Sequence, residues 1–437
     1  MHFLTVAALA AQVLGTYLIW PNRWNIPAHL NLGFCVTAYF VPGLGTDVWD
    51  LFDDRTNLIY SQINILGACA LLGGLLVGAR VGLFDGSRPI LMRLYDSGRM
   101  RLAAVERTQW VALVAIIGMI AAYRIMGFVP MFAEDPFSAK QFKNEYFEPY
   151  YRAAYLFRSS FSILVVVIPL LLTIWWVQGR RLKPFVLSGV SVVLIAVSLA
   201  RQSFALGIIT FMGIMATRSA RGFRWFMVFN ALIFPLGSAA YLLLGLLTGV
   251  ERFTSIYSVD SIADVVSSGA PDIFDQLTFL SGFQDINNFT YGRTFFGGLV
   301  PGNFLWNPSV WSLTYDNLGA DISDLVSGGL RFSTALWGYC SFGWIGVVLV
   351  PFFSGFLNGS MIRVLKRLPL SSSLIASAFV LAIYMTLGHQ LIEYYLLSIH
   401  EIPSIACALF LAYGLRTRRR TNRTPPQLPA QELTSTR

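Results

Sequence analysis

Residues 159–178 read SSFSILVVVIPLLLTIWWVQ, a run of twenty residues without a charge. At 1.5 Å per residue, a helix of this length covers about 30 Å, which is the thickness of the hydrocarbon core of a bilayer. Similar apolar runs recur along the whole chain of 437 residues. We therefore predict an all-α, polytopic membrane protein that lies in a lipid bilayer.

The composition supports the same class of protein. Only 13% of the residues are charged, against about 25% in an ordinary soluble domain, which excludes a soluble enzyme. The net charge of +9 could indicate nucleic-acid binding, but the recurring apolar runs favour a membrane, so no nucleic-acid partner is expected. The four cysteines lie in or beside apolar runs without a CxxC spacing, and this arrangement indicates neither disulfides nor a zinc site.

Eleven apolar stretches are long enough to be considered as spans. The first lacks the basic start and cleavage site of a signal peptide, so we interpret it as a retained helix. The sixth and seventh are short and joined only by Arg201 and Gln202, which predicts a helical hairpin with its turn near the membrane surface or partly within it. The predicted spans are 3–20, 26–43, 60–83, 109–132, 159–178, 185–200, 203–217, 225–249, 336–359, 372–393 and 396–414.

Charge sorts the loops into two sets. The loops at 44–59, 133–158 and 250–335 carry 17 acidic and eight basic residues, whereas the remaining loops and the tail carry 22 basic and four acidic residues. The positive-inside rule makes the basic side cytoplasmic and, with eleven spans, puts the N-terminus in the periplasm and the C-terminus in the cytoplasm. The predicted organisation is residues 1–249 with eight helices, 250–335 as a large periplasmic loop of short helices along the membrane surface, 336–415 with three helices, and 416–437 as a disordered cytoplasmic tail.

Four charges fall within or at the ends of predicted spans: Arg124, Arg201, Glu393 and Glu401. Each costs at least about 2.5 kcal/mol in a bilayer and is a functional candidate; the alternative is a long side chain that reaches the headgroups. His389 lies four residues before Glu393, on the same helix face, and such a pair can act as a general base with its orienting partner. The alternative is a polar pair that stabilises the helix.

Arginines in the outward loops form a second group of candidates. Arg293 and Arg331 lie in the acidic loop 250–335, and Arg152 and Arg158 precede the fifth span. A guanidinium group binds phosphate oxygens in a bidentate manner, so these residues suit a lipid-linked diphosphate. The alternative is pairing with neighbouring acids such as Asp285 or Asp324.

The large loop also contains candidates for contact with a glycan or an acceptor. Asp275 and Asp285 flank an amphipathic stretch, residues 276–284, that could lie over a groove, although most outward acids are simply solvated. Trp306 and Trp311, with Tyr291 nearby, offer flat faces that can stack on sugar rings; the alternative is packing at the membrane interface. No Asp-x-Asp metal motif, Walker motif or Gly-x-Ser-x-Gly motif is present, so neither a metal nor another cofactor is expected.

Several motifs together resemble the bacterial oligosaccharide repeat-unit polymerases, the Wzy-type O-antigen and exopolysaccharide polymerases. These motifs are Arg201 in Ser198-Leu-Ala-Arg-Gln, the late loop with Tyr291-Gly-Arg-Thr-Phe-Phe and Gly328-Gly-Leu-Arg331, and a following span that begins Phe342-Gly-Trp-Ile-Gly346 and ends at Gly359. Many relatives carry an acid just before this span, where the present chain has Ala335-Leu-Trp337.

The resemblance implies a GT-C-like, metal-independent glycosyltransferase of the bacterial inner membrane. Its donor and acceptor would both be polyprenyl-diphosphate-linked oligosaccharides, and a chain-length regulator is a further partner that the resemblance leaves open. The implied diphosphate clamp is Arg201, Arg293 and Arg331, with Arg158 and Arg124 as further cations, and the base is Glu393, His389 or Asp285.

Two other functions compete with this interpretation. An O-antigen ligase would need a histidine in the large loop, and residues 250–335 contain none. A flippase or transporter would need polar residues through the middle of the membrane, whereas the polarity of this chain lies at its outward face.

Overall fold

The chain folds into helices. The computed structural model describes residues 1–255, 257, 260–286, 288–296, 299, 331–392, 399 and 402–413, and within them there is no strand, which confirms the all-α class. In chain order the helices are α1 (His2–Leu14), α2 (Thr16–Ile19), α3 (Ile26–Cys35), η1 (Val36–Phe40), α4 (Val41–Gly45), η2 (Val48–Leu51), α5 (Asp54–Val81), η3 (Asp85–Ser87), α6 (Arg88–Asp96), α7 (Gly98–Met126), η4 (Pro130–Phe132), α8 (Pro136–Gln141), η5 (Asn144–Tyr146), α9 (Phe147–Val177), α10 (Leu182–Ala196), α11 (Arg201–Ala216), α12 (Ala220–Ser238), α13 (Ala240–Thr248), α14 (Glu251–Thr254), α15 (Ile262–Gly269), α16 (Asp272–Ile286), α17 (Arg293–Phe296), α19 (Thr334–Lys366), α20 (Leu374–Ile392) and α21 (Ile402–Tyr413).

Length and hydropathy make several of these helices compatible with a bilayer. Among the described residues, α5, α7, α9 and α19 are long and apolar enough to cross a membrane, and α12 with α13 form a fifth candidate that bends by 51°. Five apolar helices of 10–17 residues accompany them, including the pair α10 and α11 at the predicted hairpin. The structure is thus compatible with a membrane protein, while the count of eleven spans stays a prediction.

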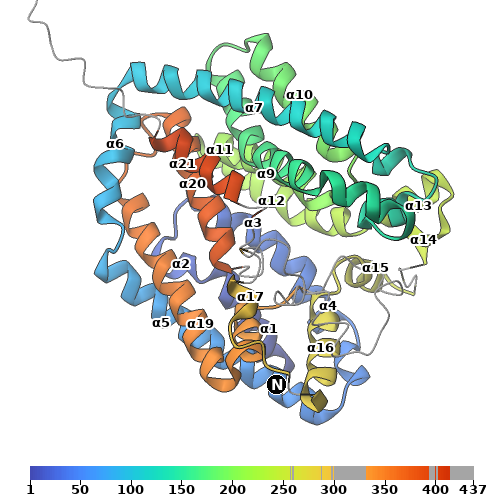
Figure 1. The fold of residues 1–437 in the computed structure, drawn as a ribbon. Coiled ribbons are helices and arrows are strands. Elements are labelled where there is room, and N and C mark those ends of the chain that lie inside the picture. Colours follow the sequence, from blue (N-terminus) through green and yellow to red (C-terminus); the bar gives the residue numbers. More distant parts are fainter. Residues whose placement is uncertain are drawn as a thin grey trace, which may run out of the picture.

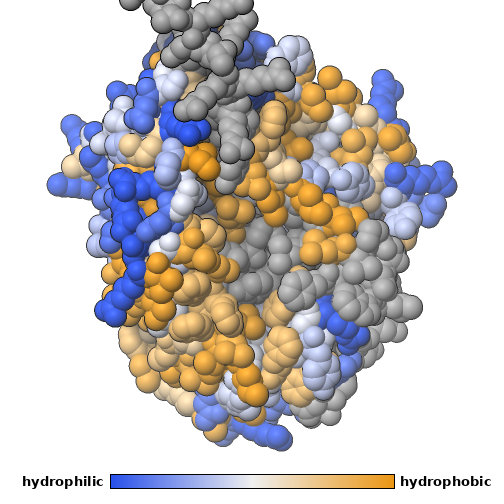
Figure 2. All heavy atoms as spheres, turned by 60° about the vertical axis from the view of Figure 1, so that its left-hand side comes forward, coloured by the Kyte–Doolittle hydropathy of each residue, from blue (hydrophilic) through white to orange (hydrophobic). Residues whose placement is uncertain are grey.

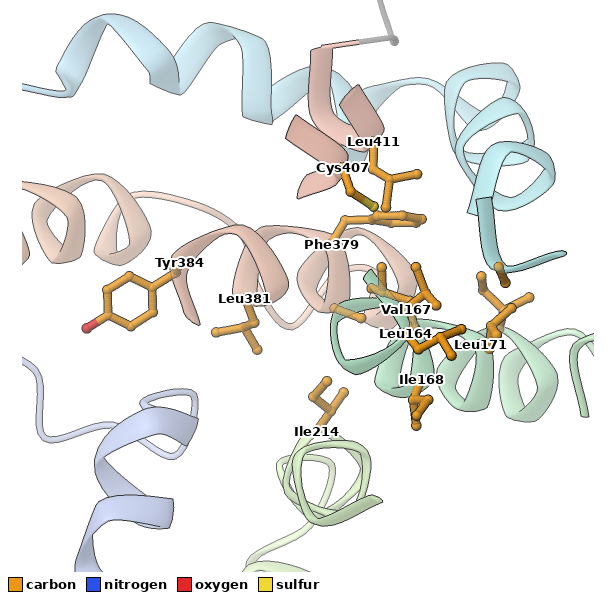
Figure 3. Close-up of a cluster of buried hydrophobic side chains, with 14 of the residues drawn as sticks. Leu164, Val167, Ile168, Leu171, Ile214, Phe379, Leu381, Tyr384, Cys407 and Leu411 are labelled. Atoms are coloured by element: carbon orange, nitrogen blue, oxygen red, sulfur yellow. The ribbon is translucent and has the colours of Figure 1, made fainter. Parts of the chain in front are cut away.

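The long helices form two groups. Figure 1 shows α7, α9 and α10 along one side of the molecule, and α1, α5 and α19 along the other. Each group has its own cluster of buried apolar side chains. Figure 3 shows part of the first cluster, where Leu164 and Ile168 of α9 lie near Ile214 of α11, with Phe379 of α20 and Leu411 of α21 beside them.

Glycines bring α5 and α19 into backbone contact. A Cβ added at Gly78 would lie 2.0 Å from the carbonyl oxygen of Phe356, and one at Gly355 would lie 2.1 Å from that of Leu71. Small residues allow this close approach, which is how helices in a membrane gain van der Waals contact. Gly359 meets Leu75 in the same way, so the two helices run in the same direction.

The chain folds back within α19. Gly343 has φ 61° and ψ −147°, a conformation that essentially only glycine adopts, and Phe342 beside it is also non-helical. A Cβ at Gly338 would lie 2.2 Å from the carbonyl oxygen of Gly346, so the segment before the turn packs on the segment after it. The predicted straight span 336–359 therefore begins with a short re-entrant helix that ends at the glycine turn.

Another predicted span also differs from the structure. The span expected at 225–249 breaks between α12 and α13, where Pro235 removes a backbone donor and favours a bend. The span expected at 26–43 is helical throughout, because α3 continues directly into the π-helical η1 and then into α4. Helix α16 of the predicted periplasmic loop buries Leu277, Phe279 and Phe283 completely in the second apolar cluster, and its position along the membrane surface stays a prediction.

The outer surface of the bundle is apolar as well. Val114 and Ile117 of α7 are 67% and 58% exposed, and Ile345 of α19 is 68% exposed. Figure 2 shows a broad hydrophobic face with hydrophilic residues at its edges. Such a face suits contact with lipid and explains why apolar residues are found both inside and outside this bundle.

Candidate functional site

An ion pair lies at the first turn of α16. The Arg331 Nε atom is 3.3 Å from Asp272 Oδ1; the Asp272 side chain is 1% exposed and the Arg331 side chain 36%. The guanidinium carbon of Arg331 also lies 5.9 Å from the centre of the Phe34 ring. Asp275 is one turn further along α16. We call Asp272, Asp275 and Arg331 the acid–arginine cluster.

Contacts with α5 place this cluster inside the bundle. Gln284 Nε2 donates to Thr56 Oγ1 at 3.2 Å, and the Tyr60 hydroxyl donates to Gln276 Oε1 at 3.0 Å, so α16 runs antiparallel to α5. The amino end of α16, with Asp272, therefore lies deeper along α5 than Tyr60 does. The α5 residues that contact α16 lie in the first two turns of α5, at the end that is predicted to face outward.

A buried polar network holds the segment that follows Arg331. Asn64 Oδ1 accepts hydrogen bonds from Ser333 Oγ at 2.7 Å and from Gln12 Nε2 at 3.0 Å, and the Ala335 N–H donates to Gln12 Oε1 at 3.2 Å. Asn64 lies ten residues into α5, which is about 15 Å along the helix. Because satisfied buried networks favour one arrangement, this network fixes the position of Arg331 two residues before Ser333.

Asp275 has the properties of a proton acceptor. The pKa of its carboxyl group is raised from 3.8 to about 7: burial is the largest cause, the negative charge of Asp272 acts in the same direction, and the Arg331 guanidinium acts in the opposite direction. At neutral pH this carboxyl group therefore exchanges between its two protonation states. Groups of this kind are frequent at functional sites because they can take up and release a proton under working conditions.

The predicted hairpin turn forms a second region of interest. Leu199 has a positive φ of 60°, and its carbonyl oxygen accepts a hydrogen bond from the Tyr241 hydroxyl at 2.8 Å. The Lys140 Nζ atom lies 3.8 Å from the centre of the Tyr241 ring. Arg201 is the first residue of α11, two residues after Leu199, and its side chain lies outside the described part of the chain. Lys140 therefore adds a cation near this turn that the sequence analysis did not select.

The bend between α12 and α13 connects the two regions. The carbonyl oxygen of Ser238, at the end of α12, accepts a hydrogen bond from the Tyr257 hydroxyl at 2.7 Å. Gly269 packs closely on the same residue, because a Cβ added at Gly269 would lie 2.1 Å from the Ser238 carbonyl oxygen. Tyr241, which binds the hairpin turn, follows three residues after Ser238, and Asp272 follows three residues after Gly269. Contacts thus hold the turn that precedes Arg201 against α13, and hold the end of α12 against the segment that leads into α16.

The other predicted arginines lie in separate local environments. Arg124 is exposed in the last turn of α7, where a cation interacts favourably with the helix dipole. Arg158 is exposed on α9, and its Nε donates to the hydroxyl group of Tyr150. Arg293 is half-buried, and its Nε donates to the Thr290 carbonyl at 3.2 Å. None of these three arginines forms an ion pair with a residue that the structure describes.

The remaining predicted residues are only partly covered by the structure. Tyr291 is 75% exposed, and its backbone N–H donates to the Ser341 carbonyl at 3.0 Å, beside the glycine turn of α19. Asp285 belongs to α16 and His389 to α20, but both side chains lie outside the described part of the chain. Glu393, Trp306 and Trp311 lie outside the described residues altogether.

The sequence analysis had considered an ion pair as the alternative role for Arg331, but with Asp285 or Asp324 as its partner. The described partner is Asp272, which lies 59 positions earlier in the chain. Within the described ranges, no group of three or more His, Cys, Asp or Glu side chains is arranged to hold a metal ion. The candidate chemistry of this site therefore consists of a guanidinium group next to two carboxyl groups, one of which titrates near neutrality.

Comparisons with known proteins give no relative for this chain. No family model matches it, no curated protein matches it, and no solved structure matches its fold.

Proposed function

We propose that the protein is a glycosyltransferase of the bacterial inner membrane that polymerises oligosaccharide repeat units linked to polyprenyl diphosphate. The proposal includes eleven spans, a periplasmic N-terminus and a cytoplasmic C-terminus, with transfer at the periplasmic side. Donor and acceptor are both lipid-linked glycans. The apolar helices and the motifs that resemble repeat-unit polymerases support the class of protein.

The observation that carries the proposal is the acid–arginine cluster, in which Arg331 pairs with the buried Asp272 and the charges of both act on the nearby Asp275 carboxyl group. The Asp275 carboxyl group, with a pKa of about 7, can accept the proton of a sugar hydroxyl at neutral pH. Arg331 is about one third exposed, so part of its guanidinium group remains accessible to phosphate oxygens although Asp272 pairs with it. Asp275 thus replaces Asp285, His389 and Glu393 as the base that we favour.

In the proposed reaction, an acceptor hydroxyl oxygen attacks the anomeric carbon of the donor glycan. The new glycosidic bond forms between these two atoms while the bond from the anomeric carbon to the diphosphate oxygen breaks. The hydroxyl proton passes to the Asp275 carboxylate. The departing lipid diphosphate carries the negative charge, and Arg331 and Arg201 are the cations proposed to stabilise it.

Surface polysaccharide from a strain that lacks the gene tests this proposal. A strain without the polymerase should retain one capped repeat unit in place of a ladder of longer products, whereas loss of a ligase should leave no capped unit. Restoring the wild-type gene should restore the ladder, and Asp275→Asn should leave it absent at equal protein level. Arg152→Gln is the matched control, because Arg152 forms an exposed ion pair with Glu148 away from the cluster. An intact ladder in the deletion strain would refute the proposal.

A further inference from the structure

A cavity opens at the opposite end of the bundle, on the side where the loops are basic. Its volume is about 750 Å³. It lies where α7 and α20 begin and where α9 and α11 end, together with the segment before α3. The residues that line it are Arg23, Trp24, Gly98, Arg101, Leu102, Val105, Val177, Gln178, Thr217, Arg218 and the continuous segment 371–375.

Three arginines from three separate elements converge on this cavity. Arg23 precedes α3, Arg101 lies in the first turn of α7, and Arg218 follows α11. No Asp or Glu occurs among the described residues that line the cavity, and none of the three arginines pairs with a described acid. Like charges around one cavity repel each other, so a bound anion would stabilise this arrangement.

Two helix ends add hydrogen-bond donors and partial positive charge. Helices α7 and α20 both begin at the cavity, and the amino end of a helix favours an anion. Ser371 and Ser372 precede α20 and are exposed. Ser373 caps the helix by accepting a hydrogen bond from the Ala376 N–H at 3.4 Å. Guanidinium groups, hydroxyl groups and helix amino ends together are the donors that a phosphate group requires.

The rest of the wall is apolar. Trp24, Leu102, Val105 and Val177 contribute hydrophobic surface. The cavity also lies where apolar helices end, which in a bilayer is the level of the lipid headgroups. A cavity of this size holds a ligand considerably larger than a phosphate ion. An amphiphile with a phosphate headgroup and an apolar chain matches both parts of the wall.

We infer that this cavity binds the phosphate headgroup of an anionic lipid from the leaflet predicted to face the cytoplasm. The site lies at the other end of the bundle from the acid–arginine cluster and does not depend on the proposed polymerase activity. In this arrangement Arg23, Arg101 and Arg218 hold the phosphate oxygens, and the apolar wall contacts the first carbons of the lipid chains.

Calorimetric titration of the full chain in an uncharged detergent tests this inference, with dioctanoyl phosphatidic acid as one probe and inorganic pyrophosphate as the other. We expect the lipid to bind the wild-type protein and the affinity to fall at least tenfold in Arg101→Gln with Arg218→Gln. The matched control is Arg221→Gln with Arg224→Gln. It removes two exposed arginines on the same side that do not line the cavity, and its affinity should stay within twofold of wild type.

Three results would overturn the inference. These are no lipid binding to the wild type, an equal loss in both double variants, and pyrophosphate binding that matches and displaces the lipid, which would indicate a soluble phosphate ligand. If the double variant does not fold, Ser372→Glu serves instead, because it places a carboxylate at an exposed position in the cavity wall. It should weaken lipid binding at least fivefold, while Ser87→Glu, outside the cavity, should not.

Discussion

The acid–arginine cluster and the arginine cavity use the same cation in opposite ways. At the cluster, Arg331 lies next to Asp272, whose side chain is 1% exposed, and the charges are paired within the fold. At the cavity, three arginines surround a space of about 750 Å³ whose described lining contains no acid. The paired Arg331 offsets the charge of a buried carboxylate within the fold. The arginines of the cavity have no acidic partner among its described lining, so a bound anion can form ion pairs with them. Their different surroundings, rather than the number of arginines, distinguish the structural and proposed catalytic role of the cluster from the proposed binding role of the cavity.

The largest expected effect is the loss of the Arg331 charge. Arg331→Met leaves the Asp272 carboxylate buried without its cation, and we expect a loss of about 3 kcal/mol in the free energy of unfolding. Arg101→Met should leave the stability unchanged or raise it slightly, because it removes one of three like charges. Thermal unfolding of both variants in detergent measures the difference, and equal losses would contradict the comparison.

A second substitution separates loss of charge from loss of packing at the cluster. Asp272→Asn in the Arg331→Met background removes the buried charge that was left behind, so about 2 kcal/mol of the loss should return. The same unfolding measurement applies. If the double variant is less stable than Arg331→Met, the loss comes from packing, and the paired-charge interpretation is wrong.

Asp275 should make the proposed activity depend on pH. Because the pKa is about 7 and the carboxylate is the reactive form, the rate should rise about tenfold per pH unit below 7 and level off above it. Asp275→Asn should remove this dependence together with the activity. Chain elongation on lipid-linked repeat units between pH 5 and 9 is the measurement, with Arg152→Gln as the control. A flat profile for the wild type would exclude Asp275 as the base.

The same carboxyl group predicts the direction of a stability change with pH. Its pKa in the folded protein is raised above 3.8, so the folded state binds the proton more tightly than the unfolded state does. The favourable contribution is full below about pH 4 and is lost as the pH rises through 7. Asp275→Asn, which stays neutral, should therefore gain stability relative to wild type between pH 5 and pH 8, as measured by thermal unfolding.

The smallest expected effects concern salt and an exposed pair. Lipid binding at the cavity should weaken severalfold between 0.05 and 0.5 M NaCl, because salt screens its accessible arginines. Salt should screen the ion pair of Arg331 with the buried Asp272 much less.

The Arg152→Gln substitution breaks an ion pair whose side chains are 69% and 67% exposed, so the free energy of unfolding of this variant should change by less than about 0.5 kcal/mol. A larger change would remove its value as a control.

Hydropathy predicted the helical class and the positions of the long helices. The runs at 60–83, 109–132 and 159–178 correspond to α5, α7 and α9. In lipid the backbone N–H and C=O groups find no water, and a helix satisfies them within the same segment. The short hairpin at Arg201 was also expected, and α10 and α11 are correspondingly short. The glycines of the last long run were visible in the sequence, but the fold-back at Gly343 was not predicted, because a glycine permits a turn without requiring one.

The candidate site was predictable only as a set of residue types. Arg331 and Asp275 were selected from the sequence, and an ion pair was foreseen for Arg331, but the partner Asp272 was not. Asp275 acquires its pKa of about 7 from burial, which depends on how α16 packs. Lys140 was not selected, because its contact with the Tyr241 ring joins two residues about a hundred positions apart and is therefore not visible in the sequence.

The sequence by itself determined the helical class of this protein and predicted its lipid environment and the charge difference between its two sets of loops, because these follow from composition and from apolar runs along the chain. Only the tertiary structure decided which charges are paired. It brings Arg331 to Asp272 and gathers Arg23, Arg101 and Arg218 around one cavity. Electrostatic energy depends on distance and burial in space, and the packing of distant helices sets both.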